Sequence, residues 1–215
     1  MRKDVFTGAV LALALATGAA TAGAQSRSGT MMEIQPATSK LWIEGTSSLH
    51  DWSCTAGTVN GSVELDAAYS TLNLQTNPKI AKTVAISVPV KEMKCGHGKM
   101  DGNMYKALRA DEFPTIEYKL GGYDVTPQAD DPASFVMHTR GTLTIAGQTK
   151  DVQFDITAHR APNGEVKVQG SQPIVMTDYD VKPPKAMLGT IKTGKTVTVK
   201  FDLLLAPAAA KVGGR

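Results

Sequence analysis

The sequence predicts an all-β fold of about eight strands, arranged as a sandwich or as a closed barrel. Apolar residues recur at every second position in several runs, and this is the period of a strand with one buried face. Turn-forming residues such as Ala146-Gly147 and Pro162-Asn163-Gly164 separate the runs. One stretch has the spacing of a helix, and it is short.

The N-terminal segment 1–24 has the pattern of a secretory signal peptide. Arg2 and Lys3 precede an apolar run over 5–16, and small residues end at Ala24. The run is too short to span a bilayer comfortably, and no later segment could stop transfer. We therefore expect cleavage after Ala24 and a periplasmic or secreted protein without an integral membrane segment. An uncleaved anchor or a buried helix is the alternative interpretation.

Strands are expected wherever the alternation recurs. It is clearest over residues 84–90, 116–120, 152–158 and 197–205. It is weaker over residues 41–43, 59–65, 135–145 and 166–174. The sequence shows no internal repeat and no second domain, and the low-complexity tail over 206–215 is expected to be disordered.

The stretch 99–110 departs from the strand period. Met100, Met104, Ala107 and Leu108 recur at spacings of three and four residues, which predicts a short amphipathic helix that cannot continue through Pro114. Such a helix could plug one mouth of a barrel. Alternatively, its apolar stripe simply packs on the sheet.

Charge and hydropathy exclude several classes of protein. A formal net charge of +3 argues against a strongly basic nucleic-acid binder. A mean hydropathy of -0.13 excludes a multi-span helical membrane protein. An outer-membrane barrel would need aromatic girdles, and the aromatic residues here are scattered.

Export favours a disulfide between Cys54 and Cys95, because oxidising compartments promote such bonds. A metal site made from Cys54, Cys95, His97 and His50 is the rival interpretation. It lacks the tight spacing of known zinc motifs, so no metal is expected.

Catalytic patterns are weak or missing, so we do not expect an enzyme. The sequence contains no G-x-S-x-G, H-E-x-x-H or P-loop motif. Ser47, His50 and Asp51 are close in sequence, but near neighbours on a strand or turn point apart and do not form a triad. His138 and His159 lie on polar strand faces and are expected to be exposed.

Small residues on the apolar faces raise the question of a cavity. Gly45, Gly61, Gly141 and Gly170 share the parity of the large apolar residues, and small inward residues leave volume for a ligand. Glycine in strands also marks bulges and barrel corners. A filled barrel that acts as a stress-related or partner-binding module is therefore the alternative function.

Several segments resemble the YceI-like family. Residues 111–118 resemble its D-x-x-P-x-I-x-F segment, and residues 141–152 resemble its G-x-L-T-I-x-G-x-T-K-x-V hairpin. The stretch 99–110 falls where this family has a helical insert. Residues 45–52, with His50-Asp51-Trp52, and 189–194 resemble a subgroup with an H-D-W motif.

The resemblance covers residues 33–205, and it implies that this domain is an eight-stranded antiparallel, lipocalin-like barrel with a short helical insert. It further implies a non-catalytic protein without a cofactor, whose apolar tunnel binds an isoprenoid lipid or an isoprenoid quinone. Whether two chains pair as a homodimer stays open. Inward strand residues and the insert would line the tunnel, which gives as candidate ligand-binding residues Ile43, Met100, Met104, Leu108, Phe113, Ile116, Tyr118, Phe135, Met137, Leu143, Ile145, Phe154 and Phe201.

His50 and Trp52 complete the set of candidate ligand-binding residues. They could close one mouth of the tunnel and donate hydrogen bonds to a ligand head group through their ring N–H groups. In the structural alternative, Trp52 packs beside the Cys54 disulfide and His50 bonds the backbone of a turn.

Overall fold

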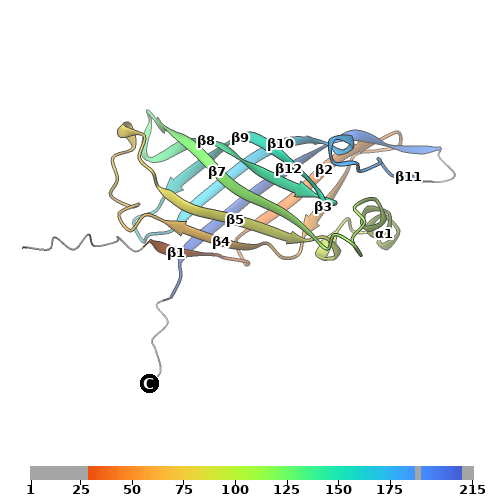
Figure 1. Ribbon diagram of the computed structural model, residues 1–215, viewed down its shortest axis with the longest axis horizontal. Helices are drawn as coiled ribbons and strands as arrows, with labels where there is room; N and C mark the ends of the chain where they lie inside the picture. The colour runs from red at the N-terminus through yellow and green to blue at the C-terminus, as the bar shows by residue number, and fades with distance from the viewer. Residues whose placement is uncertain (1–28, 187–189, 210–215) are drawn as a thin grey trace, which may run out of the picture.

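Antiparallel strands wound around one interior make up most of the computed structural model, which describes residues 29–186 and 190–209 (Figure 1). The predicted signal peptide, residues 1–24, and residues 210–215 of the predicted tail lie outside the described residues. In chain order the elements are β1 (Thr30–Ile34), β2 (Lys40–Ser47), β3 (Trp52–Ala56), β4 (Asn60–Leu65), η1 (Leu74–Thr76), β5 (Ala81–Pro89), η2 (Val90–Glu92), β6 (Met93–Lys94), α1 (Gly98–Ala107), β7 (Thr115–Gln128), β8 (Asp131–Ile145), β9 (Gln148–Arg160), β10 (Val166–Val175), η3 (Met176–Tyr179), β11 (Lys185–Ala186) and β12 (Ile191–Pro207).

The strands close into a ring of eight, in the order β1-β4-β5-β7-β8-β9-β10-β12 and back to β1. β1 closes it, because it pairs with β4 on one side and with the end of β12 on the other. The earlier part of β12 pairs with β2, and β3 and β6 extend the sheet from there. The predicted eight-stranded antiparallel, lipocalin-like barrel with a short helical insert is confirmed.

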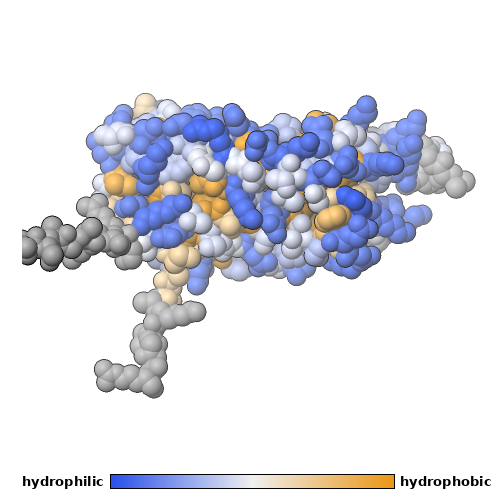
Figure 2. All heavy atoms as spheres, viewed as in Figure 1, coloured by the Kyte–Doolittle hydropathy of each residue, from blue (hydrophilic) through white to orange (hydrophobic). Residues whose placement is uncertain are grey.

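Strand alternation places apolar side chains inside the barrel and polar ones outside. On β9, Phe154 and Ile156 face the interior, whereas Asp155 is exposed. Hydrophilic residues cover most of the face seen in Figure 2. The arrangement is the reverse of an outer-membrane barrel, whose apolar residues face outward.

Tight turns at the predicted positions fix the strand register. Ala146 and Gly147 have φ angles of 48° and 81°, and they form the two-residue turn between Ile145 and Gln148. Gly164 has a φ of 84° in the turn between β9 and β10. These left-handed conformations match the right-handed twist of the strands they join.

β12 continues into the segment assigned to the tail, which the sequence predicted to begin at residue 206. Ala206 and Pro207 pair with Glu33 and Met32 of β1. Ala208 N–H then donates to the carbonyl of Met31 at 2.8 Å. The boundary was misplaced because alanine and proline carry no strand signal of their own, while the pairing with β1 depends on residues far away in sequence.

Helix α1 is shorter than the predicted stretch 99–110. His97 caps its first turn by accepting a hydrogen bond from Lys99 N–H at 3.3 Å. The helix ends before Arg109, which has a left-handed φ of 50°. Within residues 29–186 and 190–209, no helix is both long and apolar enough to cross a membrane.

One end of the barrel is closed by the loop over residues 66–80. The Tyr69 hydroxyl donates to the carbonyl of Gly164, and Arg160 Nη1 donates to the carbonyls of Tyr69 and Leu72 at 2.7 and 3.2 Å. Tyr69 and Leu74 are buried in the core cluster below this loop. The loop therefore forms a fixed floor.

Side chains join β5 to β7 where their backbone pairing ends, and we call this join the seam. Paired residues run from Pro89 and Thr115 to Ala85 and Lys119, next to a bulge in β7 between Leu120 and Gly122. Beyond it, the Tyr123 hydroxyl accepts from Ala81 N–H at 2.7 Å and donates to the Ala81 carbonyl at 3.1 Å.

Asn77 and Lys79 complete the seam from the floor loop. Asn77 Oδ1 accepts from Val125 N–H at 2.7 Å, and Lys79 Nζ donates to the Tyr123 carbonyl at 3.1 Å. Burial raises the pKa of Tyr123, so its hydroxyl stays protonated and can donate. Side chains thus replace the missing backbone ladder.

The Tyr123→Phe change should lower the free energy of unfolding by about 1–2 kcal/mol, because the Ala81 backbone groups lose their partner. Urea denaturation would measure this difference. The matched control is Tyr118→Phe, because the buried Tyr118 hydroxyl has no hydrogen-bond partner within the described chain. Equal stability of the two variants would contradict the role of the seam.

Candidate functional site

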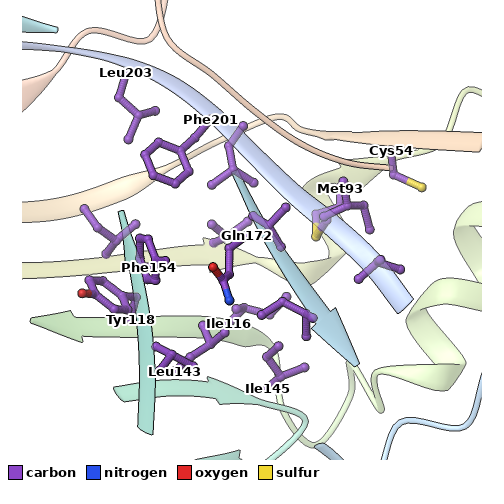
Figure 3. A pocket seen from close by; sticks show the side chains of 18 of the residues that line it. Cys54, Met93, Ile116, Tyr118, Leu143, Ile145, Phe154, Gln172, Phe201 and Leu203 are labelled. Atoms are coloured by element: carbon purple, nitrogen blue, oxygen red, sulfur yellow. The ribbon is translucent and has the colours of Figure 1, made fainter. Parts of the chain in front are cut away.

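A cavity of about 460 Å³ occupies the barrel interior and is lined almost entirely by apolar side chains (Figure 3). Its walls include Leu65 and Val166 near the floor, and Leu49 and Lys185 at the opposite end. We call that opposite end the mouth. Figure 1 shows α1, β3 and β11 gathered there.

The structure brings together nearly all residues that the sequence assigned to ligand binding. Those that line the cavity are Ile43, His50, Trp52, Met100, Met104, Leu108, Ile116, Tyr118, Phe135, Met137, Leu143, Ile145, Phe154 and Phe201. Their assignment to the interior follows from strand parity and from the apolar stripe of α1. Contact with a ligand stays a prediction.

Phe113 is the exception, and its predicted place in the lining is wrong. Its ring lies under the Arg109 guanidinium, 4.6 Å from Cζ to the ring centroid. A Cβ on Gly147 would lie only 2.5 Å from the same ring, which shows how closely Phe113 covers the β8–β9 turn. Phe113 precedes β7, so the strand parity that holds from Ile116 onward does not apply to it.

Sequence reasoning did not assign several lining residues on β5, β7 and β10 to ligand binding. Leu120 shares the parity of Ile116 and Tyr118 on β7, and Ile86 is the pairing partner of Tyr118 on the neighbouring strand β5. Val168 of β10 also lines the cavity, although no residue of β10 was assigned. Gln172 shares the parity of Val168, but a polar residue in a weak strand gave no signal of an inward position. Arg160 ends β9 on the inward parity and also lines the cavity.

Three aromatic rings meet around the middle of the cavity, and we call them the collar. The rings of Tyr118 and Phe154 have centroids 5.4 Å apart, and those of Phe154 and Phe201 are 6.4 Å apart in an edge-on arrangement. Such offset and edge contacts stabilise aromatic pairs beyond their buried area. The collar therefore fixes the width of the cavity.

Glycines opposite the collar let these rings lie against the wall. A Cβ on Gly170 would lie 2.4 Å from Phe201, and one on Gly141 would lie 2.8 Å from Tyr118. At the mouth, a Cβ on Gly45 would lie 2.3 Å from the Trp52 ring. Gly45, Gly141 and Gly170 are thus covered by rings, and Gly61 is covered by the Ile34 and Ile86 side chains. The sequence analysis had expected these glycines to leave volume for a ligand, but neighbouring side chains fill the space beside them.

Two buried polar atoms in the wall have no hydrogen-bond partner within the described chain: Tyr118 Oη and Arg160 Nε. Burial raises the pKa of Tyr118 and lowers the pKa of Arg160. The other hydrogen bonds of Arg160 hold the floor loop, which accounts for its place in the structure.

The hairpin between β2 and β3 carries the H-D-W segment at the mouth. Ser47 Oγ donates to the His50 carbonyl at 2.7 Å, and His50 Nδ1 donates to the Asp51 carbonyl at 2.7 Å. The Trp52 indole N–H donates to the Thr46 carbonyl at 3.1 Å. These ring N–H groups already serve the backbone, as in the structural alternative, although both side chains also border the cavity.

Helix α1 covers the mouth, with Met100, Met104 and Leu108 directed to the cavity. Of the two alternatives for its apolar stripe, the structure therefore supports the plug. Tyr105 on its other side donates its hydroxyl to the Met93 carbonyl at 2.8 Å and receives a hydrogen bond from Lys94 Nζ at 2.8 Å. These contacts attach the helix to β6.

A disulfide between Cys54 and Cys95 joins β3 to the segment that leads into α1. The Cys95 N–H also donates to Asp101 Oδ1 of the helix at 2.7 Å, and Met104 is buried in the same cluster as Cys54. The predicted disulfide is present, so its sulfur atoms are not metal ligands.

Histidines outside the barrel pair with carboxylates along the wall. His138 Nδ1 lies 2.8 Å from Asp155 Oδ1, and His159 Nδ1 lies 3.1 Å from Asp131 Oδ2. Both histidines are solvent-accessible, as predicted. Within the part of the chain that the structure describes, no group of three or more His, Cys, Asp or Glu side chains could hold a metal ion.

Together these features define a closed, antiparallel, lipocalin-like barrel around an apolar cavity, with a helix over its mouth. The chain belongs to the YceI-like family, whose YceI-like domain matches residues 32–205. This match confirms, at the level of the family, the resemblance that the sequence motifs indicated.

Solved structures support the same fold at low sequence identity. BcnA of Burkholderia cenocepacia matches with a TM-score of 0.61 and 16% identity, over 80% of this chain and 99% of that one. A polyisoprenoid binding domain from Saccharophagus degradans, implicated in plant cell wall breakdown, matches with a TM-score of 0.61 and 13% identity, over 83% and 99%. The YceI protein of Campylobacter jejuni matches with a TM-score of 0.52 and 14% identity, over 73% and 84%. No curated protein matches this chain in sequence.

Replacing Cys54 and Cys95 together by serine should lower the free energy of unfolding by about 2–4 kcal/mol, because the disulfide no longer restricts the unfolded chain. Thermal or urea denaturation would measure the loss. Reductant should destabilise the wild type to a similar degree and leave the double variant unchanged. A variant as stable as the oxidised wild type would show that the disulfide does not anchor this region.

Proposed function

We propose that this chain is exported and holds an isoprenoid chain, polyprenyl or quinone-type, inside its barrel without altering it chemically. The observation that carries the proposal is one apolar cavity whose lining extends from the mouth to the floor loop. A long cavity with apolar walls suits a long apolar ligand. A filled barrel would have closed this space.

The hydrophobic effect would supply the affinity. Burial of each CH₂ group contributes about 0.8 kcal/mol, so a few isoprene units bind strongly without any polar contact. Branched aliphatic side chains and flexible methionines such as Met100 and Met104 can adapt to the methyl branches of a prenyl chain.

The likeness to the polyisoprenoid binding domain of Saccharophagus degradans supports the choice of ligand class. Residues 1–24 and the disulfide support export to the periplasm or the cell exterior, where disulfides persist. We also propose that His50-Asp51-Trp52 marks a subgroup within the family, because the segment shapes the mouth through which a ligand would pass.

The Leu143→Trp change should lower lipid retention strongly while leaving the protein folded and exported, because the larger ring would fill the cavity next to the collar. The protein would be purified from its periplasm without detergent, and native mass spectrometry with organic extraction would identify and quantify bound lipid. We expect one isoprenoid per wild-type chain.

The matched control is Thr142→Trp, which adds the same ring to the outer face of the same strand and should retain lipid like the wild type. Equal retention by both variants would contradict the placement of the ligand. A wild-type protein that is empty and takes up no added isoprenoid would overturn the proposed function and favour a partner-binding module.

A further inference from the structure

The amide of Gln172 lies inside the cavity, away from both of its ends. Inward parity on β10 directs this side chain to the interior, and Figure 3 shows it among apolar neighbours. Its partner on β12 is Val199, about 20 Å along that strand from Thr193 at the mouth. Val166 near the floor lies about 20 Å away in the other direction along β10.

This amide uses little of its hydrogen-bonding capacity. Nε2 donates to the Pro173 carbonyl at 3.3 Å, while Oε1 accepts no hydrogen bond from the described residues. A glutamine amide offers two N–H groups and one carbonyl oxygen. The second N–H and Oε1 therefore have only water or a ligand in the cavity as partners, because the neighbouring lining side chains are apolar. The single hydrogen bond to Pro173 is the only polar contact of this amide with the described residues.

The other polar groups of the cavity wall do not compete for a ligand at this depth. The Thr139 hydroxyl donates to the Phe154 carbonyl at 2.7 Å. Tyr118 Oη and Arg160 Nε are buried within the wall and are not exposed to the cavity. The remaining polar lining residues, such as His50 and Lys185, lie at the mouth.

We propose that Gln172 makes the cavity selective for lipids that carry a carbonyl-type oxygen, and that this oxygen rests at mid-depth beside Gln172. This inference rests on the proposed function, because it assumes that a lipid occupies the cavity. The free N–H of Gln172 donates to the ligand oxygen, and apolar parts of the ligand fill the space on either side. A purely hydrocarbon chain leaves the amide unpaired and binds less well.

The test compares two probes, geranylgeranylacetone, an isoprenoid ketone, and squalene, an isoprenoid hydrocarbon. Their affinities would be measured by displacement of Nile red from the delipidated wild type and from Gln172→Leu. We expect this change to lower the affinity for the ketone about tenfold, which corresponds to the loss of one buried hydrogen bond. The affinity for squalene should rise or stay the same.

The matched control is Gln169→Leu, on the outer face of the same strand, where Gln169 Nε2 donates to Asp202 Oδ2 at 2.8 Å. This control should leave the ratio of the two affinities unchanged. Thermal denaturation without ligand gives a second readout, in which Gln172→Leu should melt at the same or a higher temperature. A fall in melting temperature together with an unchanged ratio would assign Gln172 a structural role and overturn the inference.

Failure of lipid binding and failure of the selectivity give different results in this experiment. If neither probe displaces Nile red from the wild type, the proposed lipid binding itself is wrong. If both probes bind and Gln172→Leu leaves their affinity ratio unchanged, lipid binding stands and the selectivity assigned to Gln172 is wrong.

Discussion

The limited cross-section of a closed eight-stranded ring is the constraint on which the cavity depends. Such a ring has little more interior space than its own side chains fill. Here large rings and empty space coexist because glycines receive the rings: Gly170 lies beneath Phe201, Gly141 beneath Tyr118, and Gly45 beneath Trp52. Each ring therefore lies against the wall at its glycine.

The same constraint explains the closure of the two ends. An apolar interior open to water at both ends would expose much of its lining. The floor loop covers one end through hydrogen bonds from Arg160, and α1 covers the other with Met104 and Leu108. The disulfide at Cys95 anchors the short helix, because a helix of this length has little stability of its own.

Much of the architecture follows from local sequence signals. The period of two identified the inward residues of β9 and β12, the Ala146-Gly147 turn fixed one hairpin, and the spacing of Met100, Met104 and Leu108 identified the helix. The resemblance to the YceI-like family predicted that the strands close into a barrel. The fold is shared with solved structures at 13% and 16% identity, which fits a fold that depends on residue pattern more than on particular residues.

Features that depend on distant partners could not be predicted in this way. Phe113 leaves the lining because Arg109 and Gly147 hold its ring, and both contacts require the tertiary fold. The inward parity of Gly141 and Gly170 indicated unfilled volume inside the barrel. Only the three-dimensional structure shows that aromatic rings lie against these glycines. Gln172 and Arg160 were missed because a polar residue on an inward parity looks like an interruption of the strand.

The seam is the part of the barrel wall where side chains, and not a backbone ladder, hold β5 to β7. Separating these strands beyond Ala85 and Lys119 breaks contacts of Tyr123, Asn77 and Lys79, while β5 keeps its ladder to β4 and β7 keeps its ladder to β8. Over this stretch the join between β5 and β7 therefore depends on these three side chains, beside the lining residues Val84 and Leu120. None of the three lines the cavity, so a substitution among them acts on the barrel wall without changing the lining.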